Sequence, residues 1–595
     1  MKPKRIRLPD GAGIKAGLSA SVTEHHQSND HQFFQPWQHA WCSNLSRIAM
    51  NIITSNTEIV DAVIVGSGPS GAIAARRLAE AGMSVVCLEQ GEYPNYASIN
   101  FDEPTFELKR DQVFNWYPNR RMNSADYPIN DLESDVAPFM WNGVGGSSVI
   151  YAAAWHRFQP SNFRVKTLDG VAEDWPLTYE DLDPYYTEAE LQFSVSGVGG
   201  DPSYPPFDPP LPPLPMSDLT KKMFESHKRL GWHIWPGTNA IASVKHNNLN
   251  PCVRRGACMA PACLDGAKAS TDRTHWPINI KLGVKLIQRA RVSRVETDSQ
   301  GLATGVTYID RATGKEHFQA ARIVLIGANG IGTPRILLNS HSSRFPTGLA
   351  NSSDMVGRNL MMHPHGMVMG LFDDFFDSWQ GPTGQRAYSQ QFTETQPGVG
   401  FVRGAKWQLM GTGGPLNQIG TWPWGKPAGW GEEFHKTVFK RFGHSGMWSI
   451  IGEDLPNPEN RVIIDPSLKD ADGIPAPKII YRCDENSKKL IAWHEEHAAM
   501  SFKEAGAYEV IKAPEARETG WHIMGTARMG LNPETSVVDG WNRSHDVPNL
   551  YILDGSVFPT SGPVNPTGTV AALALRAADG IVKNRRDQVV SGKSK

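Results

Sequence analysis

Three glycines near residue 70 have a spacing that suits a loop wrapped around phosphate groups. Gly66, Gly68 and Gly71 form the pattern G-x-G-x-x-G directly after the apolar run Val60–Val65. The first glycine permits a tight turn, the second lets a pyrophosphate approach the backbone, and the third lets the next helix pack closely. The free N–H groups at the start of that helix, near Ser70, would then face the phosphates.

An acidic residue follows the second predicted strand of this unit. A helix is expected over residues 70–81 and a buried strand over 84–88, and Glu89 comes next. A carboxylate at that offset can accept hydrogen bonds from ribose hydroxyl groups, and its charge would repel the 2′-phosphate of NADP. A glycine triad alone is weak evidence, but the complete strand–helix–strand unit predicts a dinucleotide site for NAD or FAD.

Three of the six cysteines lie close together and could form a disulfide, a metal site or neither. Cys252, Cys258 and Cys263 have the spacing C-x5-C-x4-C. A disulfide would leave one thiol over. A zinc ion would need a fourth ligand, for which His246 and His275 are the nearest candidates. A three-iron cluster needs three cysteine ligands.

The overall composition excludes several classes of protein. The chain has 595 residues, a net charge of −2 and 6 cysteines. This charge gives no attraction to nucleic acids or anionic lipids, and so few cysteines indicate a reducing compartment. No apolar run is long enough to span a bilayer, and no apolar segment of an export signal follows the basic start. The length favours two domains packed together.

A second strand–helix pair near the C-terminus also presents polar groups at a strand end. The run LYILDGSV predicts a buried strand that ends at Asp554 and Gly555, a position suited to a ribityl or diphosphate contact. A helix is expected to open near Thr567, with Pro566 in its first turn. The proline-rich stretch 200–215 predicts a stiff connector where the chain leaves the nucleotide-binding domain.

Several stretches together resemble the glucose–methanol–choline (GMC) family of FAD-dependent oxidoreductases. They include the dinucleotide unit, a second glycine-rich loop, WNGVGGSSVIYAAAWHRFQPSNF, and the late motif GWHIMGTARMG. The pattern is most similar to the bacterial sugar and gluconate dehydrogenase branch, and it runs from about residue 58 to the end. Beyond the dinucleotide unit, the similar stretches are residues 141–163, 174–190, 323–340, 356–366, 520–530 and 549–581.

The resemblance implies an α/β fold with two domains. A Rossmann-like FAD-binding domain, similar to that of p-hydroxybenzoate hydroxylase, would accompany a discontinuous α+β substrate domain built on an antiparallel sheet. We expect most of the polar, His-rich segment 1–57 to be disordered. The expected FAD-binding domain comprises residues 58–199, 280–352 and 520–595, and the substrate domain comprises 200–279 and 353–519, with the cysteine loop at 251–270.

The resemblance also implies where FAD would bind. Some sugar oxidases of the family tether the flavin through a His, but Ile150 lies at that place here, which predicts dissociable FAD. The backbone of Val292 would meet the adenine, and the helix opening at Thr567 would face the pyrimidine edge of the flavin. The expected cofactor-binding residues are Gly66, Gly68, Ser70, Gly71, Glu89, Gly145, Gly146, Ser147, Val292, Asp554, Gly555, Asn565 and Thr567.

Two residues match the catalytic positions of the family. Alcohol oxidation needs a base for the hydroxyl proton while the flavin takes the hydride, and His522 lies where the family keeps its catalytic His. Asn565 lies where the family keeps a second His or an Asn, and its amide can orient the substrate oxygen. Taken alone, the first would more often be a structural histidine and the second a helix cap. We expect no direct catalytic role for His363, His365, His156 or His275.

For the three cysteines, the resemblance favours an iron–sulfur centre. The sugar and gluconate dehydrogenase branch holds a three-iron, four-sulfur cluster in a loop that Cys252, Cys258 and Cys263 match in position. Such a cluster passes electrons singly, so a haem subunit or a quinone would be the acceptor, and a small partner subunit would complete the protein. We expect a cytoplasmic location, or a periplasmic one if the partner carries the export signal.

The expected reaction is oxidation of an alcohol group of a sugar, glycoside, aminosugar or polyol, with an acceptor other than dioxygen. An oxidase that forms hydrogen peroxide and a non-catalytic FAD-binding scaffold stay open as alternatives, because fold and cofactor do not fix the function.

Overall fold

The computed structural model describes residues 58–99, 107–109, 114–256, 258, 263–420, 423–513 and 517–590. All of them belong to one unit of the chain, residues 55–595. The expectation of disorder for residues 1–57 therefore lies outside the described part.

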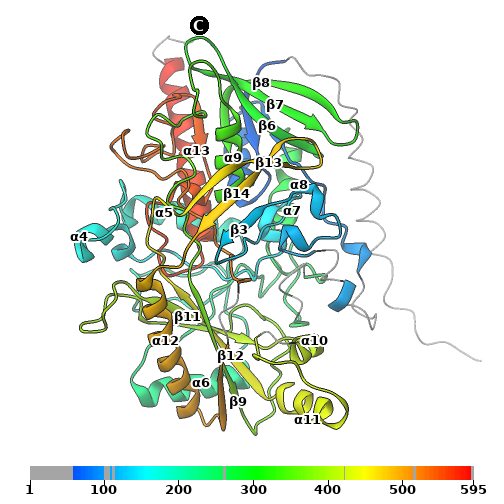
Figure 1. Ribbon diagram of the computed structural model, residues 1–595, viewed down its shortest axis with the longest axis vertical. Helices are drawn as coiled ribbons and strands as arrows, with labels where there is room; N and C mark the ends of the chain where they lie inside the picture. Colours follow the sequence, from blue (N-terminus) through cyan, green and yellow to red (C-terminus); the bar gives the residue numbers. More distant parts are fainter. Residues whose placement is uncertain are drawn as a thin grey trace, which may run out of the picture. The chain divides into compact units, whose positions relative to one another are not determined.

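A seven-stranded sheet contains the nucleotide-binding unit predicted from the sequence (Figure 1). Its strands are β1 (Val60–Val65), β2 (Val85–Leu88), β5 (Lys285–Ile287), β6 (Ala290–Thr297), β7 (Ala303–Asp310), β8 (Lys315–Ile326) and β16 (Leu550–Ile552). The order is β5-β2-β1-β8-β7-β6, with β16 also paired to β8. The second half of β8 pairs in parallel with β1 and β16, and its first half pairs antiparallel with β7. One strand thus belongs to both a parallel and an antiparallel region.

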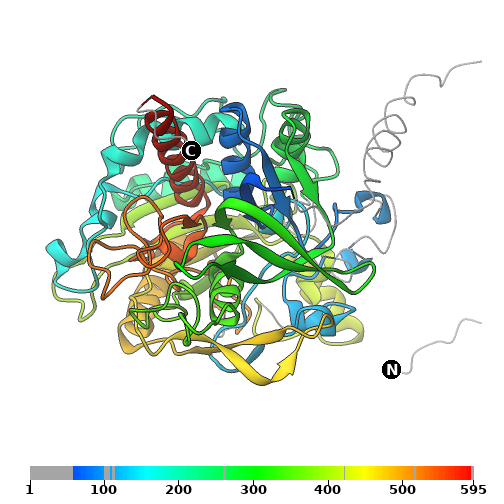
Figure 2. The ribbon, with the colours of Figure 1, turned by 90° about the horizontal axis from the view of Figure 1, so that it is seen from above.

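Helices rich in small residues pack close to the parallel strands. The main ones are α2 (Pro69–Glu80), α5 (Tyr179–Gln192), α9 (Asn329–Asn339) and α13 (Thr567–Val590), and shorter ones are α4 (Val165–Asp169), α7 (Thr271–Thr274) and α8 (Trp276–Lys281). Ala72, Ala74 and Ala75 of α2 are fully buried, and α13, the red helix in Figure 2, packs on α2 and α5. The predicted strand–helix–strand unit and the C-terminal strand and helix are confirmed, with the first helix beginning one residue earlier.

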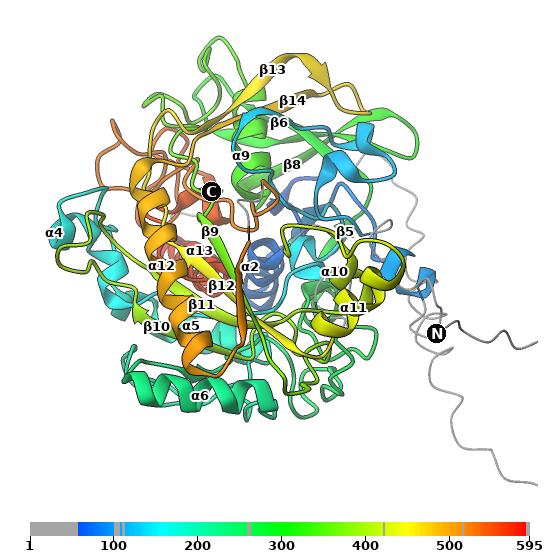
Figure 3. The same ribbon diagram turned by 60° about the horizontal axis from the view of Figure 1, so that its bottom comes forward.

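A six-stranded antiparallel sheet lies in the other half of this unit. Its strands, in spatial order, are β15 (Glu509–Lys512), β9 (His365–Leu371), β12 (Ser445–Gly452), β11 (Ala405–Gly411), β10 (Ala387–Phe392) and β4 (Trp235–Pro236). Figure 3 shows α6 (Asp218–Leu230) and α12 (Glu485–Glu504) along this sheet, where they bury Trp407, Trp448 and Ile450. Because side chains alternate along a strand, Lys406 and Gln408 of β11 lie on the opposite face. Two further helices are α10 (Pro415–Ile419) and α11 (Gly431–Arg441).

A three-stranded sheet joins segments far apart in the sequence. It comprises β3 (Asn130–Ser134), β13 (Arg461–Lys469) and β14 (Pro475–Tyr481), the last two drawn in yellow in Figure 2. The central strand, β14, pairs antiparallel with β13 and parallel with β3. Since β3 falls in the expected FAD-binding domain and the hairpin in the expected substrate domain, this sheet crosses the predicted boundary, which stays a prediction.

The predicted fold class is confirmed: the described residues form a mixed α/β structure with a Rossmann-like unit and a separate antiparallel sheet. None of the helices in the described ranges is both long and apolar enough to cross a membrane.

Candidate active site

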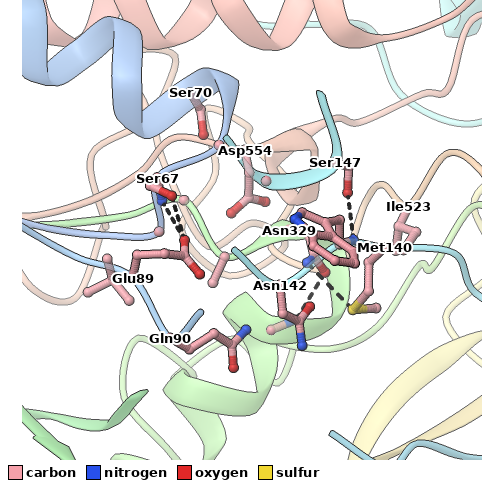
Figure 4. A pocket seen from close by; sticks show the side chains of 18 of the residues that line it. Ser67, Ser70, Glu89, Gln90, Met140, Asn142, Ser147, Asn329, Ile523 and Asp554 are labelled. Carbon is pink, nitrogen blue, oxygen red and sulfur yellow. Dashed lines mark hydrogen bonds between the residues drawn. The ribbon is translucent and has the colours of Figure 1, made fainter. Parts of the chain in front are cut away.

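A pocket lies at the carboxyl ends of the parallel strands β1 and β2. Its walls include the turn after β1, Glu89 after β2, Val292 of β6 and Thr567 at the start of α13. Figure 4 shows the carboxylate of Glu89 directed at Ser67, with Asp554 nearby. Ligands of open α/β sheets bind in this kind of crevice.

The predicted glycine loop forms one wall of the pocket, and its three glycines meet different neighbours. A Cβ on Gly66, whose φ is +96°, would lie 2.4 Å from the carbonyl oxygen of Gly327, and one on Gly71 would lie 2.0 Å from that of Gly66. A Cβ on Gly68 would lie no closer than 3.7 Å to any atom, the Cα of Gly146. The chain's own packing therefore requires two of the glycines, whereas the middle one leaves room for a ligand. No side chain caps the N-terminus of α2, so its N–H groups stay available to an anion.

Two buried carboxylates lie at the pocket. Glu89 accepts hydrogen bonds from the backbone N–H of Ser67 at 3.0 Å, from its hydroxyl group at 2.6 Å and from the N–H of Gly91 at 3.0 Å. Asp554 accepts a bond of 2.5 Å from the hydroxyl group of Thr333, and burial raises the pKa of its carboxyl group. Glu89 thus holds the turn after β1, and Asp554 is held against α9.

Most of the residues predicted to contact FAD line this pocket. They are Gly66, Gly68, Ser70, Glu89, Gly146, Ser147, Val292, Asp554, Gly555 and Thr567. Gly71, Gly145 and Asn565 are not among its lining residues; the first packs α2 onto β1, and the second has a φ of +100° in the second glycine loop. Sequence reasoning missed further lining residues, although most of them flank the recognised motifs: Ser67, Gln90, Trp141, Asn142, Arg291, Asn329 and Trp521.

His522 also lines the pocket, and it contacts a second histidine. Its Nδ1 lies 2.7 Å from Nδ1 of His363, whose Nε2 lies 2.5 Å from the carbonyl oxygen of Gly562. A carbonyl oxygen only accepts, so Nε2 of His363 carries the proton and its Nδ1, in the neutral ring, is an acceptor. His522 must then donate from Nδ1, which leaves the lone pair on its Nε2. The backbone at Gly562 therefore fixes which nitrogen of His522 can act as a base.

The surroundings keep these imidazoles neutral. Burial lowers the pKa of His522 well below its ordinary value, and the neighbouring His363, His365 and Lys406 lower it further. Burial also lowers the pKa of His363 to about 3 and that of His365 to about 4. A neutral His522 is the form that can take up a proton.

Asn565 lies on the basic side of His522. Its Nδ2 is 3.4 Å from Nε2 of His522, and its Oδ1 accepts a hydrogen bond of 2.5 Å from Nζ of Lys406. The structure thus brings the two predicted catalytic residues together, and it adds a lysine that the sequence reasoning missed. The alternation of polar and apolar residues in AKWQLMG, 405–411, was the available signal for a polar face on a buried strand.

Of the other histidines, for which we expect no direct catalytic role, His363 lies beside the site. It precedes β9, which begins at His365, and it contacts His522 directly. The extended chain before Pro364 is what places this ring at the site. His156 bonds to Tyr204 and Gln385, and His275 bonds to Thr274 and Gln192.

The three cysteines do not fit the iron–sulfur cluster that the resemblance implies. Cys252, Cys258 and Cys263 pack in one apolar cluster, but the described residues contain no group of three or more His, Cys, Asp or Glu side chains placed to hold a metal ion. Residues 257 and 259–262 of this loop lie outside the described part.

Family profiles described as GMC oxidoreductase match residues 60–365 and 456–574. The chain belongs to the GMC oxidoreductase family. It is therefore an enzyme of a family whose members act on alcohol groups. The predicted family and the prediction that the protein is an oxidoreductase are both confirmed.

Several characterised GMC enzymes are similar over nearly the whole chain. The 2-methyl-1,2-propanediol dehydrogenase of Mycolicibacterium austroafricanum is 37% identical, over 90% of this chain and 98% of its own. The fructose dehydrogenase large subunit of Gluconobacter japonicus is 30% identical, over 89% and 99%. The crystal structure of pyridoxine 4-oxidase from Mesorbium loti has a TM-score of 0.61 and 18% identity, over 88% of this chain and 99% of its own, which shows a shared fold.

FAD is the cofactor that the GMC family implies, and the pocket fits it. The open space above Gly68 and the uncapped N-terminus of α2 suit a diphosphate. Two buried donors of lining residues, Nε1 of Trp141 and Nδ2 of Asn142, have no hydrogen-bond partner in the structure. Since buried polar groups are rarely left unpaired, these donors suit the acceptor atoms of a bound cofactor.

Proposed function

We propose that the protein oxidises an alcohol group of a polyol, sugar, glycoside or aminosugar to a carbonyl group, with His522 as the base and FAD as the hydride acceptor. The observation that carries the proposal is the contact between His522 and His363 at the pocket described above. That contact leaves Nε2 of His522 unprotonated and facing Asn565.

FAD, when bound, supplies the ring that accepts the hydride. Nε2 of His522 takes the proton of the substrate hydroxyl group. The amide NH2 of Asn565 donates to the substrate oxygen and orients it. His363 accepts the hydrogen bond from Nδ1 of His522 throughout, so the ring cannot rotate out of place.

An aromatic wall lies beside His522. Trp521 and Phe139 both line the pocket, with ring centroids 4.6 Å apart, and Trp116 lies 5.2 Å from Trp521. An apolar wall of this kind strengthens the electrostatic contacts that orient the substrate.

The proposal includes dissociable FAD and an acceptor other than dioxygen. Ile150, at the place of the tethering histidine, packs in an apolar cluster with Ile99, Phe114 and Val149. Both relatives compared above are named dehydrogenases. The Streptomyces fradiae relative, 28% identical, is named paromamine 6'-oxidase, which keeps a peroxide-forming oxidase as the alternative. A relative named as a large subunit supports, as part of the proposal, a further small subunit. We also propose a cytochrome or quinone as the acceptor, and a cytoplasmic location, or a periplasmic one if that subunit carries the export signal.

The proposed electron path includes no iron–sulfur cluster, because the three thiols form no metal-binding group in the described part of the chain. Iron and acid-labile sulfide assays on freshly purified protein test this point. A content of three irons per flavin would show that a cluster is present and would contradict this part of the proposal.

Anaerobic reduction of the purified, FAD-loaded protein tests the proposed function. Short 1,2-diols, fructose, gluconate and an aminosugar are each mixed with the protein, and flavin absorbance is followed. At least one class should bleach the flavin, and His522→Ala should lose this reaction while it retains FAD. Peroxide formed in air at the rate of turnover would favour the oxidase, and no bleaching by any alcohol would overturn the proposal.

A further inference from the structure

Lys406 is an unusual residue for the centre of a sheet. It lies on β11, between β10 and β12, and is fully buried. Its hydrogen bonds run to amide oxygens, and among the described residues no carboxylate is recorded as its partner in an ion pair. Burying a lysine in this way costs more than burying an apolar residue of the same length, so a reason other than packing is needed.

All three hydrogen-bond positions of this amine are used. Nζ donates to Oε1 of Gln385 at 2.9 Å, to Oε1 of Gln408 at 3.0 Å and to Oδ1 of Asn565 at 2.5 Å. The two glutamines are themselves held, because Gln385 donates to the carbonyl oxygen of Thr238 and Gln408 donates to that of Gly384. Lys406 is therefore held in place by the two glutamines, and its third hydrogen bond runs to Asn565 beside His522.

The contact decides which way the amide of Asn565 faces. The oxygen and nitrogen of an amide group have nearly the same shape, so packing alone hardly distinguishes the two orientations. In the structure the amide atom that faces Lys406 is the oxygen, which is the atom that can accept from an ammonium group. The NH2 group must then face His522, where Nε2 lies 3.4 Å away.

We propose that Lys406 is a positioning residue of the active site: it holds the Asn565 amide in the one orientation that presents its NH2 group to the substrate oxygen. The proposal rests on the proposed function, since it concerns the same alcohol-binding site. Without Lys406 the amide can turn over, and a carbonyl oxygen would then face the substrate oxygen and the lone pair of His522.

A double-mutant cycle with Lys406→Met and Asn565→Ala tests this role. Lys406→Met keeps the side chain's length and removes its donors. In the FAD-loaded enzyme it should lower the limiting rate of flavin reduction about tenfold to a hundredfold, because a misplaced orienting group costs this much. The apparent dissociation constant of the alcohol should stay within about twofold, since the amide acts mainly in the transition state. In the Asn565→Ala background, Lys406→Met should slow the reaction by less than about twofold.

Lys268→Met is the matched control. Lys268 is another buried lysine, and it donates to the carbonyl oxygens of Val149, Tyr151 and Cys258, none of which contacts His522 or Asn565 in the recorded hydrogen bonds. Its effect on the rate should be the same with and without Asn565→Ala. Independent, multiplying effects of Lys406→Met and Asn565→Ala would overturn the proposal, and so would an equal coupling for Lys268→Met.

A second double-mutant cycle, measured as the midpoint of thermal unfolding of the holoenzyme, distinguishes failure of this proposal from failure of the proposed function. The midpoint shifts of Lys406→Met and Asn565→Ala should be non-additive, and this measurement needs no turnover. If alcohols reduce the flavin but the midpoint shifts are additive, the role of Lys406 is overturned and the proposed function stands. Non-additive shifts in a protein that no alcohol reduces would support the contact and overturn the proposed function instead.

Discussion

His363 and His522 meet nitrogen to nitrogen, with 2.7 Å between their Nδ1 atoms, and His363 is tied through its Nε2 to the carbonyl oxygen of Gly562. Two adjacent imidazole nitrogens can form this contact only if one carries a proton and the other does not. The carbonyl oxygen of Gly562 requires the proton of His363 to be on Nε2. His522 must therefore be protonated on Nδ1, and its Nε2 is left as the proton acceptor.

Replacing His363 with Gln or with Leu should separate this role from simple packing. A Gln amide can accept from His522 and donate to Gly562, so His363→Gln should keep the rate of flavin reduction within about tenfold of wild type. His363→Leu offers neither group, and we expect a loss of about 10²-fold, a typical contribution of a well-placed base. Anaerobic stopped-flow measurements give the rates. Equal losses in both variants would contradict the assigned proton positions.

The rate of flavin reduction should change little between about pH 8 and pH 6.5. Neutral His522 is the active form, and burial lowers its pKa well below the ordinary value, so the active fraction should fall only in more acidic solution. The limiting reduction rate, measured against pH with the alcohol at saturation, checks this. A loss of activity centred on the ordinary histidine pKa of about 6.5 would contradict it.

Two glycine substitutions should have different consequences. Gly71→Ala would place a Cβ 2.0 Å from a carbonyl oxygen of the same loop, so we expect little folded protein. Gly68→Ala has 3.7 Å of clearance, so the chain should fold, but the added methyl group would occupy the space expected for the diphosphate and lower FAD occupancy at least tenfold. Circular dichroism and the flavin-to-protein absorbance ratio distinguish the two. Full flavin content in Gly68→Ala would contradict this placement of the diphosphate.

Glu89→Ala should weaken FAD binding by about tenfold, because hydrogen bonds to a charged group contribute about 1.5–3 kcal/mol each and two of those that Glu89 accepts hold Ser67. The release of FAD, followed by flavin fluorescence, measures the effect. Glu92→Ala is the control, since Glu92 is an exposed neighbour that pairs with Arg289. Equal losses in both variants would show a general effect of removing negative charge here.

The parts of the site that lie within a local pattern could be predicted from the sequence. The glycine loop between β1 and α2, Glu89 after β2 and the polar end of β16 follow from runs of about thirty residues or fewer, because a parallel strand, its turn and its helix each leave a short-range signal. The fold class follows from the same signals.

The contacts that prepare the base could not be predicted in this way. His363 and His522 are 159 positions apart, as are Lys406 and Asn565, and each pair meets only because the antiparallel sheet docks beside the α13 N-terminus. The alternation in β11 indicates that Lys406 and Gln408 share a face, but it carries no information on what that face meets.

The β14–β3 pairing has a mechanical consequence. Strand β3 follows the first nucleotide-binding elements, and β14 leads directly toward α12 beneath the antiparallel sheet, so a swing that parted the two halves would break main-chain hydrogen bonds and the Arg335–Asp470 ion pair together. We therefore expect no hinge motion between the two halves. The frame that keeps His522 and Asn565 aligned would then stay fixed when a ligand enters.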